Sequence, residues 1–129
     1  MILCLKTDAP TTEVYVYDGD QLVASRVWGA HRTLARDLLR VCDEVLAEAS
    51  SSLSRLDSMV VFKGPGSFTG LRIGCTVANT IAYSQSIPIV GTDGESWIDA
   101  GLTRLAAGDD DRVVLPHYGA PPRVTAPRK

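Results

Sequence analysis

A glycine-rich segment, KGPGSFTGLRIG at residues 63–74, has the composition of a ligand-binding loop. Glycines allow sharp turns and leave backbone N–H groups unobstructed, and N–H groups at the start of a helix can hold a phosphate or a carboxylate. The candidate anion-binding residues are Gly64, Gly66, Ser67, Thr69 and Gly70. The spacing matches neither the GxGxxG dinucleotide pattern nor a P-loop. A structural turn in which Ser67 or Thr69 caps the following helix is therefore the alternative.

Residue types that usually carry out catalysis or bind metals are sparse and scattered in this chain. His31 and His117 are isolated from each other, and no Ser-His-Asp or Cys-His arrangement is visible. Lys6 and Asp8 follow the first apolar run; a lysine cannot ligate a metal ion, although Lys6 could contact a phosphate. We expect no catalytic residue, no metal site and no cofactor, and we expect both histidines to be surface or packing residues.

The composition is that of one ordinary globular domain. The 129 residues include 13 basic and 15 acidic side chains, a net charge of −2 and 45% hydrophobic residues. This balance lacks the strong basic bias of a nucleic-acid binder. No stretch approaches the ~18 apolar residues of a membrane span, and no secretion signal is expected at the start. Three widely spaced cysteines, Cys4, Cys42 and Cys75, predict free buried thiols in a reducing cytoplasm.

The first part of the chain predicts a meander of antiparallel strands followed by a helix. Residues 2–5, 12–17 and 21–28 are apolar or alternate between apolar and polar, and the sequence Asp18-Gly19-Asp20 favours a tight turn. From residue 31 to residue 49 the apolar side chains recur with a helical period.

Strands and helices alternate in the rest of the chain. We expect a strand at 59–62, a helix at 71–85, a strand at 87–90, a helix at 95–107 and one last candidate strand at 112–115. This alternation predicts an α/β fold with a mixed five-stranded sheet flanked by helices, in which the helix-linked strands are parallel. Residues 1–107 would form one lobe, and residues 108–129 a short C-terminal tail that is extended or disordered at its end.

The helix predicted at 71–85 has a wider apolar arc than one sheet face requires. Its apolar side chains cover roughly 200° of the helical projection, whereas a stripe somewhat over 100° wide suffices for one sheet. Gly70, Gly74, Ala78 and Ala82 recur every four residues and leave a shallow groove for the close approach of another helix. Either the first helix of this chain or the helices of a partner protein would fill that groove.

The eleven residues GPGSFTGLRIG resemble the signature of the TsaB (YeaZ) family of tRNA threonylcarbamoyladenosine biosynthesis proteins. The resemblance extends over residues 1–107 and includes ILCLKT at the start, AHRT before the first helix and the strand IPIVG. It implies a single actin/sugar-kinase/Hsp70-like (ribonuclease H-like) lobe. Because the family usually has two lobes, we expect a shortened form that retains mainly the N-terminal lobe, with LPHYGAPPRVTAPRK resembling the family's C-terminal end.

The resemblance also implies a function. Family members are non-catalytic and cytoplasmic. They support a TsaD-like catalytic subunit that transfers threonylcarbamoyl to N6 of A37 in ANN-reading tRNAs, and a TsaE-like ATPase joins the larger complex. The family pairs with TsaD through its first two helices as a heterodimer, so that tRNA is met indirectly. The interface residues expected here are Leu34, Leu38, Val41, Gly70, Arg72, Gly74, Cys75, Ala78, Asn79 and Tyr83.

Two other functions remain open at this point. The chain could be a minimal ATP-binding transferase or ATPase of the same fold that uses the loop 64–70, although Lys6 stands where the family usually has an acidic residue. It could also form a homodimer in isolation. Direct tRNA contact would use Arg123, Arg128 and Lys129.

Overall fold

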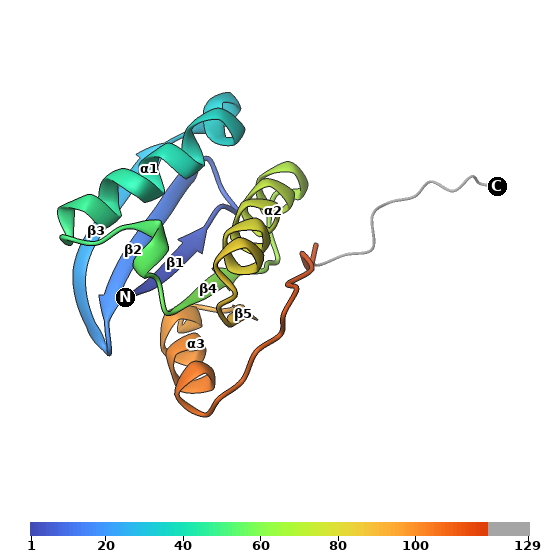
Figure 1. The fold of residues 1–129 in the computed structure, drawn as a ribbon. Helices are drawn as coiled ribbons and strands as arrows, with labels where there is room; N and C mark the ends of the chain where they lie inside the picture. The colour runs from blue at the N-terminus through green and yellow to red at the C-terminus, as the bar shows by residue number, and fades with distance from the viewer. Residues whose placement is uncertain (119–129) are drawn as a thin grey trace.

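The computed structural model of the chain describes residues 1–118, and for His31 the backbone alone. The fold has three layers, with a central sheet, two helices on one face and a third helix on the other (Figure 1). The elements are β1 (Ile2–Lys6), β2 (Thr11–Asp18), β3 (Gln21–Gly29), η1 (His31–Thr33), α1 (Leu34–Glu48), η2 (Leu53–Arg55), β4 (Ser58–Phe62), α2 (Phe68–Gln85), β5 (Ile89–Thr92) and α3 (Trp97–Ala106).

The sheet has the strand order β3-β2-β1-β4-β5. The β1–β2 and β2–β3 pairs are antiparallel, whereas the β1–β4 and β4–β5 pairs are parallel. The predicted mixed five-stranded α/β sheet is therefore confirmed. Because β1 lies at its centre, the turn that follows β1 ends beside the loops that follow β4 and β5, at the edge where parallel α/β sheets usually carry their functional groups.

Alternating side chains of the strands divide the core between the two sheet faces. Leu3 and Leu5 of β1 pack with apolar residues of α1 and α2. Cys4, on the opposite face of the same strand, belongs to the cluster that contains Trp97 of α3. All five residues of β4 are buried, as expected for an interior strand covered on both faces.

Several element boundaries differ from the sequence prediction by one to three residues, and a local cause is visible at α2 and β5. α2 begins at Phe68 instead of residue 71, because Ser67 caps the helix three residues earlier. β5 covers Ile89–Thr92 instead of 87–90. Pro88 has no N–H for a strand ladder, so it precedes the strand while its carbonyl accepts a hydrogen bond from Met59 N–H at 3.0 Å.

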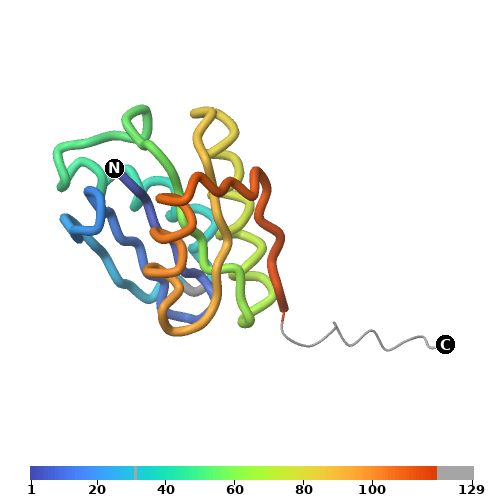
Figure 2. The backbone as a smooth tube through the Cα atoms, turned by 90° about the horizontal axis from the view of Figure 1, so that it is seen from below, coloured from blue at the N-terminus to red at the C-terminus, as the bar shows by residue number. Residues whose placement is uncertain are grey.

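The strand predicted at 112–115 is not present. Residues 109–118, which we call the C-terminal strap, run as an extended segment alongside α2 (Figure 2). The backbone of Val114 is paired with a side chain and not with a strand: Asn79 Nδ2 donates to Val114 O, and Val114 N–H donates to Asn79 Oδ1, both at 2.9 Å. Residues 119–129 of the predicted tail lie outside the described residues.

Further contacts attach the strap to the edge of the sheet. Asp111 N–H donates to Ile89 O at 2.8 Å, and Gly91 N–H donates to Asp111 Oδ2 at 2.8 Å. Arg104 Nη2 pairs with Asp111 Oδ1 at 2.5 Å, and Val114 is buried. The strap therefore takes up part of the hydrogen-bonding capacity of the β5 edge, which would otherwise be open to another strand.

Candidate functional site

The glycine-rich segment is a tight connection between β4 and α2, held to the turn after β1. Ser67 is the N-cap of α2, and its Oγ accepts a hydrogen bond from Gly70 N–H at 3.4 Å. Ser67 N–H donates to Asp8 O at 2.9 Å. The capping alternative is thus confirmed for Ser67 and not for Thr69. Two N–H groups of the predicted anion loop are engaged within the chain, and binding of an anion there stays a prediction.

Three glycines of the segment allow α2 to approach the β1–β2 turn closely. A Cβ on Gly66 would overlap Asp8, and a Cβ on Gly70 or Gly74 would overlap the carbonyl or the hydroxyl of Thr7. Thr7 is buried and donates from Oγ1 to Gly70 O at 2.7 Å. At these positions the groove of small residues is therefore filled by the β1–β2 turn, and neither by the first helix nor by a partner.

Gly64 allows the same loop to approach the backbone of the strap. It has φ +129°, a conformation that favours glycine. A Cβ there would overlap the carbonyl of His117, whose N–H donates to Lys63 O at 2.6 Å. His117 is exposed, and its contacts with this loop are made by its backbone N–H and carbonyl.

The charged residues around the β1–β2 turn pair with each other. Lys6 Nζ lies 2.6 Å from Asp8 Oδ1 and 3.8 Å from Glu13 Oε2, and 4.6 Å from the centroid of the Phe62 ring. Within residues 1–118, no group of three His, Cys, Asp or Glu side chains is arranged to hold a metal ion. A shallow cavity of about 300 Å³ beside this turn is lined mainly by hydroxyl-bearing and small residues, Thr7, Thr12, Ser67, Thr69 and Gly70 among them.

The central residues of the predicted partner interface are in the core. The buried members of that set are Leu34, Leu38, Val41, Gly74, Cys75 and Ala78. They pack against the sheet, the β1–β2 turn and one another, so they offer little surface to a partner, and this burial does not support their predicted place at the centre of an interface. Helical periodicity identifies an apolar arc, but it does not say which part of the arc the sheet covers.

The other predicted interface residues separate into two groups. Gly70 faces Thr7, and Asn79 binds the Val114 backbone, so both are used within the chain. Arg72 and Tyr83 lie on the solvent side of α2, and Tyr83 is 88% exposed. These two remain candidates for contact with a partner.

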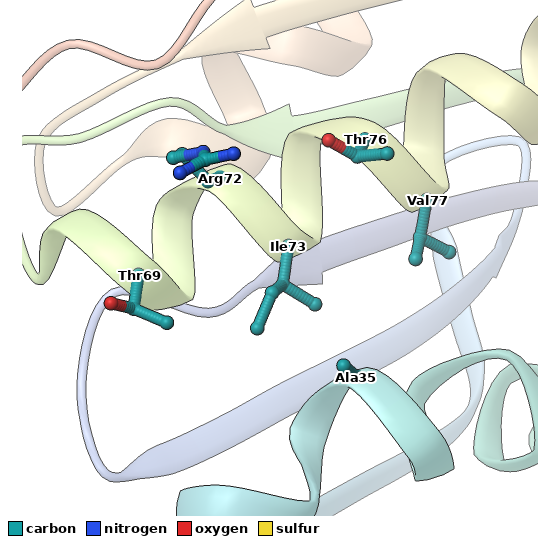
Figure 3. A pocket seen from close by; sticks show the side chains of 6 residues that line it. All are labelled: Ala35, Thr69, Arg72, Ile73, Thr76 and Val77. Carbon is teal, nitrogen blue, oxygen red and sulfur yellow. The ribbon is translucent and has the colours of Figure 1, made fainter.

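An open groove, which we call the helix groove, lies between the outer faces of α1 and α2. Its lining includes Arg72 and the residues Ala35, Leu39, Ile73, Thr76, Val77 and Thr80. Ile73 and Val77 point from α2 toward Ala35 of α1 (Figure 3). The half of the groove around Ala35 has a volume of about 350 Å³, and Leu39 in the other half is 49% exposed.

Sequence analysis missed the apolar residues of this groove. Ile73 and Val77 belong to the excess width of the α2 apolar arc, which was the available signal. Leu39 is an apolar residue beside the buried Leu38 and offers no periodic signal of its own.

Ion pairs cover the solvent edge of α1. Arg36 Nε donates to Asp37 Oδ1 at 2.9 Å, and Arg40 Nη1 donates to Glu44 Oε2 at 2.7 Å. Hydrogen bonding to Arg36 holds the pKa of Asp37 well below its ordinary value. Arg26 of β3 joins the same network through Glu44.

The three cysteines are free and buried, as predicted. Burial raises the pKa of the Cys4 and Cys42 thiols to about 12 and that of Cys75 to about 11. At neutral pH they are protonated, so they are structural residues and not nucleophiles.

In the described part of the chain, no helix is both long and apolar enough to cross a membrane.

Comparisons with known proteins agree with this geometry. Residues 29–94 match the family model described as TsaD: tRNA N6-adenosine threonylcarbamoyltransferase. The tRNA threonylcarbamoyladenosine biosynthesis protein TsaB of Haemophilus influenzae is 31% identical over 90 residues, which are 69% of this chain and 37% of that protein. The tRNA N6-adenosine threonylcarbamoyltransferase of Geobacter sp. is 40% identical over 53 residues, 41% of this chain and 16% of that enzyme.

A solved structure is similar over most of the chain. YeaZ from Pseudomonas aeruginosa has a TM-score of 0.67 at 27% identity, over 83% of this chain and 49% of that one. The chain thus spans less than half the length of the TsaB and YeaZ proteins named here. The shared fold is the α/β lobe of the actin-like class. Together with the β4–α2 glycine segment and the strand order, these similarities show that the chain belongs to the TsaB (YeaZ) family.

Proposed function

We propose that this chain serves tRNA threonylcarbamoyladenosine biosynthesis as a non-catalytic subunit that binds a TsaD-like catalytic subunit through the helix groove. The observation that carries the proposal is the groove itself. Apolar side chains of two helices, Leu39, Ile73 and Val77, remain partly or largely exposed on the face of α1 and α2 that the sheet does not cover. Neighbouring apolar residues that remain exposed in this way mark a protein interaction site.

The similarity to TsaB and YeaZ supplies the pathway, and the resemblance of the glycine segment to that family supplies the partner class. In the proposed complex the catalytic subunit transfers threonylcarbamoyl to A37 of ANN-reading tRNAs in the cytoplasm, and a TsaE-like ATPase joins the assembly. This chain would meet tRNA indirectly. In the absence of the catalytic subunit, the same groove could bind a second copy as a homodimer.

The contacts after β1 support a non-catalytic role. A cleft enzyme of this fold needs a carboxylate there that is free to hold a metal ion or orient a water molecule. Lys6 occupies that position, and the carboxylate two residues later, Asp8, pairs with it at 2.6 Å. The lysine neutralises the charge that would attract a cation.

A charge placed in the groove tests the proposal. Leu39→Glu and Val77→Glu introduce carboxylates that a docked partner would desolvate, which we expect to weaken binding to the TsaD-like subunit by a factor of about 100 or more. Binding is measured by titration calorimetry with the two purified subunits, and folding of each variant by its melting temperature.

Val27→Glu is the matched control, because Val27 is 54% exposed on β3, in a different element from the groove. The control variant should bind as the natural chain does. Equal affinity of the folded Val77→Glu and Val27→Glu variants would overturn the proposed interface.

A further inference from the structure

The arginines around the two helices differ in whether they have an acidic partner. Arg36 and Arg40 form ion pairs along α1, and Arg26 reaches across from β3 to Glu44 and Glu48. In contrast, Arg32 and Arg72 have no carboxylate within 4.0 Å among residues 1–118. Both residues are exposed.

The two unpaired arginines lie at the same end of the helix groove. Ala35 shares one half of the groove with Ile73, and Leu39 shares the other half with Thr80, so the two helices run in the same direction. Arg32 lies in η1, immediately before α1, and Arg72 is in the second turn of α2.

The carboxylates at this end, Asp37 in the first turn of α1 and Asp8 beside Ser67, are each paired with a cation, so they leave the two arginines without an acidic neighbour within the described residues. The N-termini of both helices carry partial positive charge from the aligned peptide dipoles. The side chains that line the groove include no Asp or Glu. Arg72 has its guanidinium carbon 5.6 Å from the centroid of the Phe68 ring. It is one of the residues that line the groove, and Figure 3 shows it on the edge of α2 away from Ala35.

We infer that the Arg32–Arg72 end of the helix groove recognises carboxylates of the protein partner, positioned next to an apolar ridge that enters the groove. The inference rests on the proposed function and adds the chemistry of the partner surface. Docking would remove water from the two cations, and a partner without facing carboxylates would leave them desolvated and unpaired, which is costly. Complementary charge would therefore select the partner and its orientation, and it would accelerate association.

A nucleic-acid backbone is the other anionic surface that arginines can bind. The apolar floor of the groove, formed by Ala35, Ile73 and Val77, favours a protein, because a phosphate backbone offers no apolar surface to fill it. Ion pairing along α1 has also neutralised Arg36 and Arg40, which leaves few cations for phosphates.

The test is charge reversal with a salt series. We expect Arg72→Glu to weaken binding to the TsaD-like subunit about 10-fold or more at low ionic strength and less than about 3-fold at 0.5 M NaCl, because salt screens the interaction. Arg32→Glu should act in the same direction. Arg72→Lys should retain most of the affinity, since it keeps the charge.

Arg112→Glu is the matched control, an exposed arginine of the strap with the same change of charge. A loss for Arg72→Glu no larger than for Arg112→Glu, or one that is independent of salt, would overturn the inference. If Val77→Glu still abolishes binding in that case, the proposed interface stands and only the carboxylate recognition fails. A decrease in tRNA binding by Arg72→Glu, with affinity for the protein partner unchanged, would assign the arginines to RNA and also overturn the inference.

Discussion

Two rows of apolar or small residues on α2, an inner row and an outer row, differ in what they contact. The inner row, Gly70, Gly74 and Ala78, is packed against the β1–β2 turn and the core. The outer row, Ile73 and Val77, is partly exposed in the helix groove. The part of the glycine signature that stands out in the sequence therefore serves the chain's own packing, whereas the surface available to a partner consists of residues that stand out less.

A glycine inside a helix lowers the stability of the helix, so its presence there calls for a structural reason. Glycine is about 1 kcal/mol less favourable than alanine in a helix interior. Gly74 lies in the interior of α2 and Gly70 in its first turn, and at both positions a Cβ would collide with Thr7. In the outer row no such collision exists, so larger apolar residues are accommodated.

The largest expected effect is therefore a methyl group added to the inner row. Gly70→Ala places a Cβ against the backbone carbonyl of Thr7, which cannot move without displacing β1. We expect the free energy of unfolding to fall by about 2 kcal/mol or more, because the strain exceeds the gain in helix propensity. Urea denaturation measures the change. An unchanged or increased stability would contradict the close approach of α2 to the turn.

Asn79→Ala should have the next largest effect, because Asn79 lies on the strap side of α2 and holds the strap. Its side chain satisfies both backbone groups of Val114. Removal of the amide leaves these groups unpaired beside a buried side chain, at a cost of about 1–3 kcal/mol. The variant should also be cleaved faster by a protease within residues 109–118.

Thr80→Ala is the control for the strap, since Thr80 is on the same helix and its hydroxyl donates a hydrogen bond to Thr76 O within that helix. Equal protease sensitivity of the Asn79→Ala and Thr80→Ala variants would mean that Asn79 does not hold the strap.

The sequence predicted the layers and most of the elements, because periodicity, turns and buried runs are local properties. Ser67 as a cap and the five strands follow from such signals. The faces of α1 and α2 could not be assigned in the same way. Helical periodicity places Leu38 in an apolar arc and leaves Leu39 outside it, but it does not say whether the sheet or a partner covers that arc.

The strap shows a second limit of local signals. Residues 112–115 have the apolar composition of a strand, but the backbone at Val114 pairs with a side chain that is 35 residues earlier in the chain. No spacing rule connects Asn79 to Val114. The internal role of Asn79 and the absence of the predicted strand thus have the same cause, non-local hydrogen bonding.

Acid should weaken the strap more than the inner row. Hydrogen bonding to Arg104 holds the pKa of Asp111 below its ordinary value. Because the folded state binds this proton less tightly than the unfolded state, the stabilisation is complete above the unfolded pKa of about 3.9 and is lost as pH falls through the folded pKa. We expect a loss of less than about 1 kcal/mol from this group, since the pair is partly exposed.

Asp111→Asn isolates that contribution. The free energy of unfolding of the variant should fall less between pH 5 and pH 3 than that of the natural chain, although its value at pH 7 is lower. A parallel pH dependence of the two chains would mean that the Arg104–Asp111 pair does not couple protonation to folding.

The smallest effect on stability is expected at the outer surface itself. Tyr83 is 88% exposed on α2, so Tyr83→Ala removes little buried area and should change the free energy of unfolding by no more than about 0.5 kcal/mol. Ile81→Ala is the matched control, because Ile81 is on the same helix and only 5% exposed, and its truncation should cost about 2–4 kcal/mol. Similar losses for the two variants would mean that the solvent side of α2 is not where the structure has it. The division into inner and outer rows would then fail, together with the assignment of the helix groove to a partner.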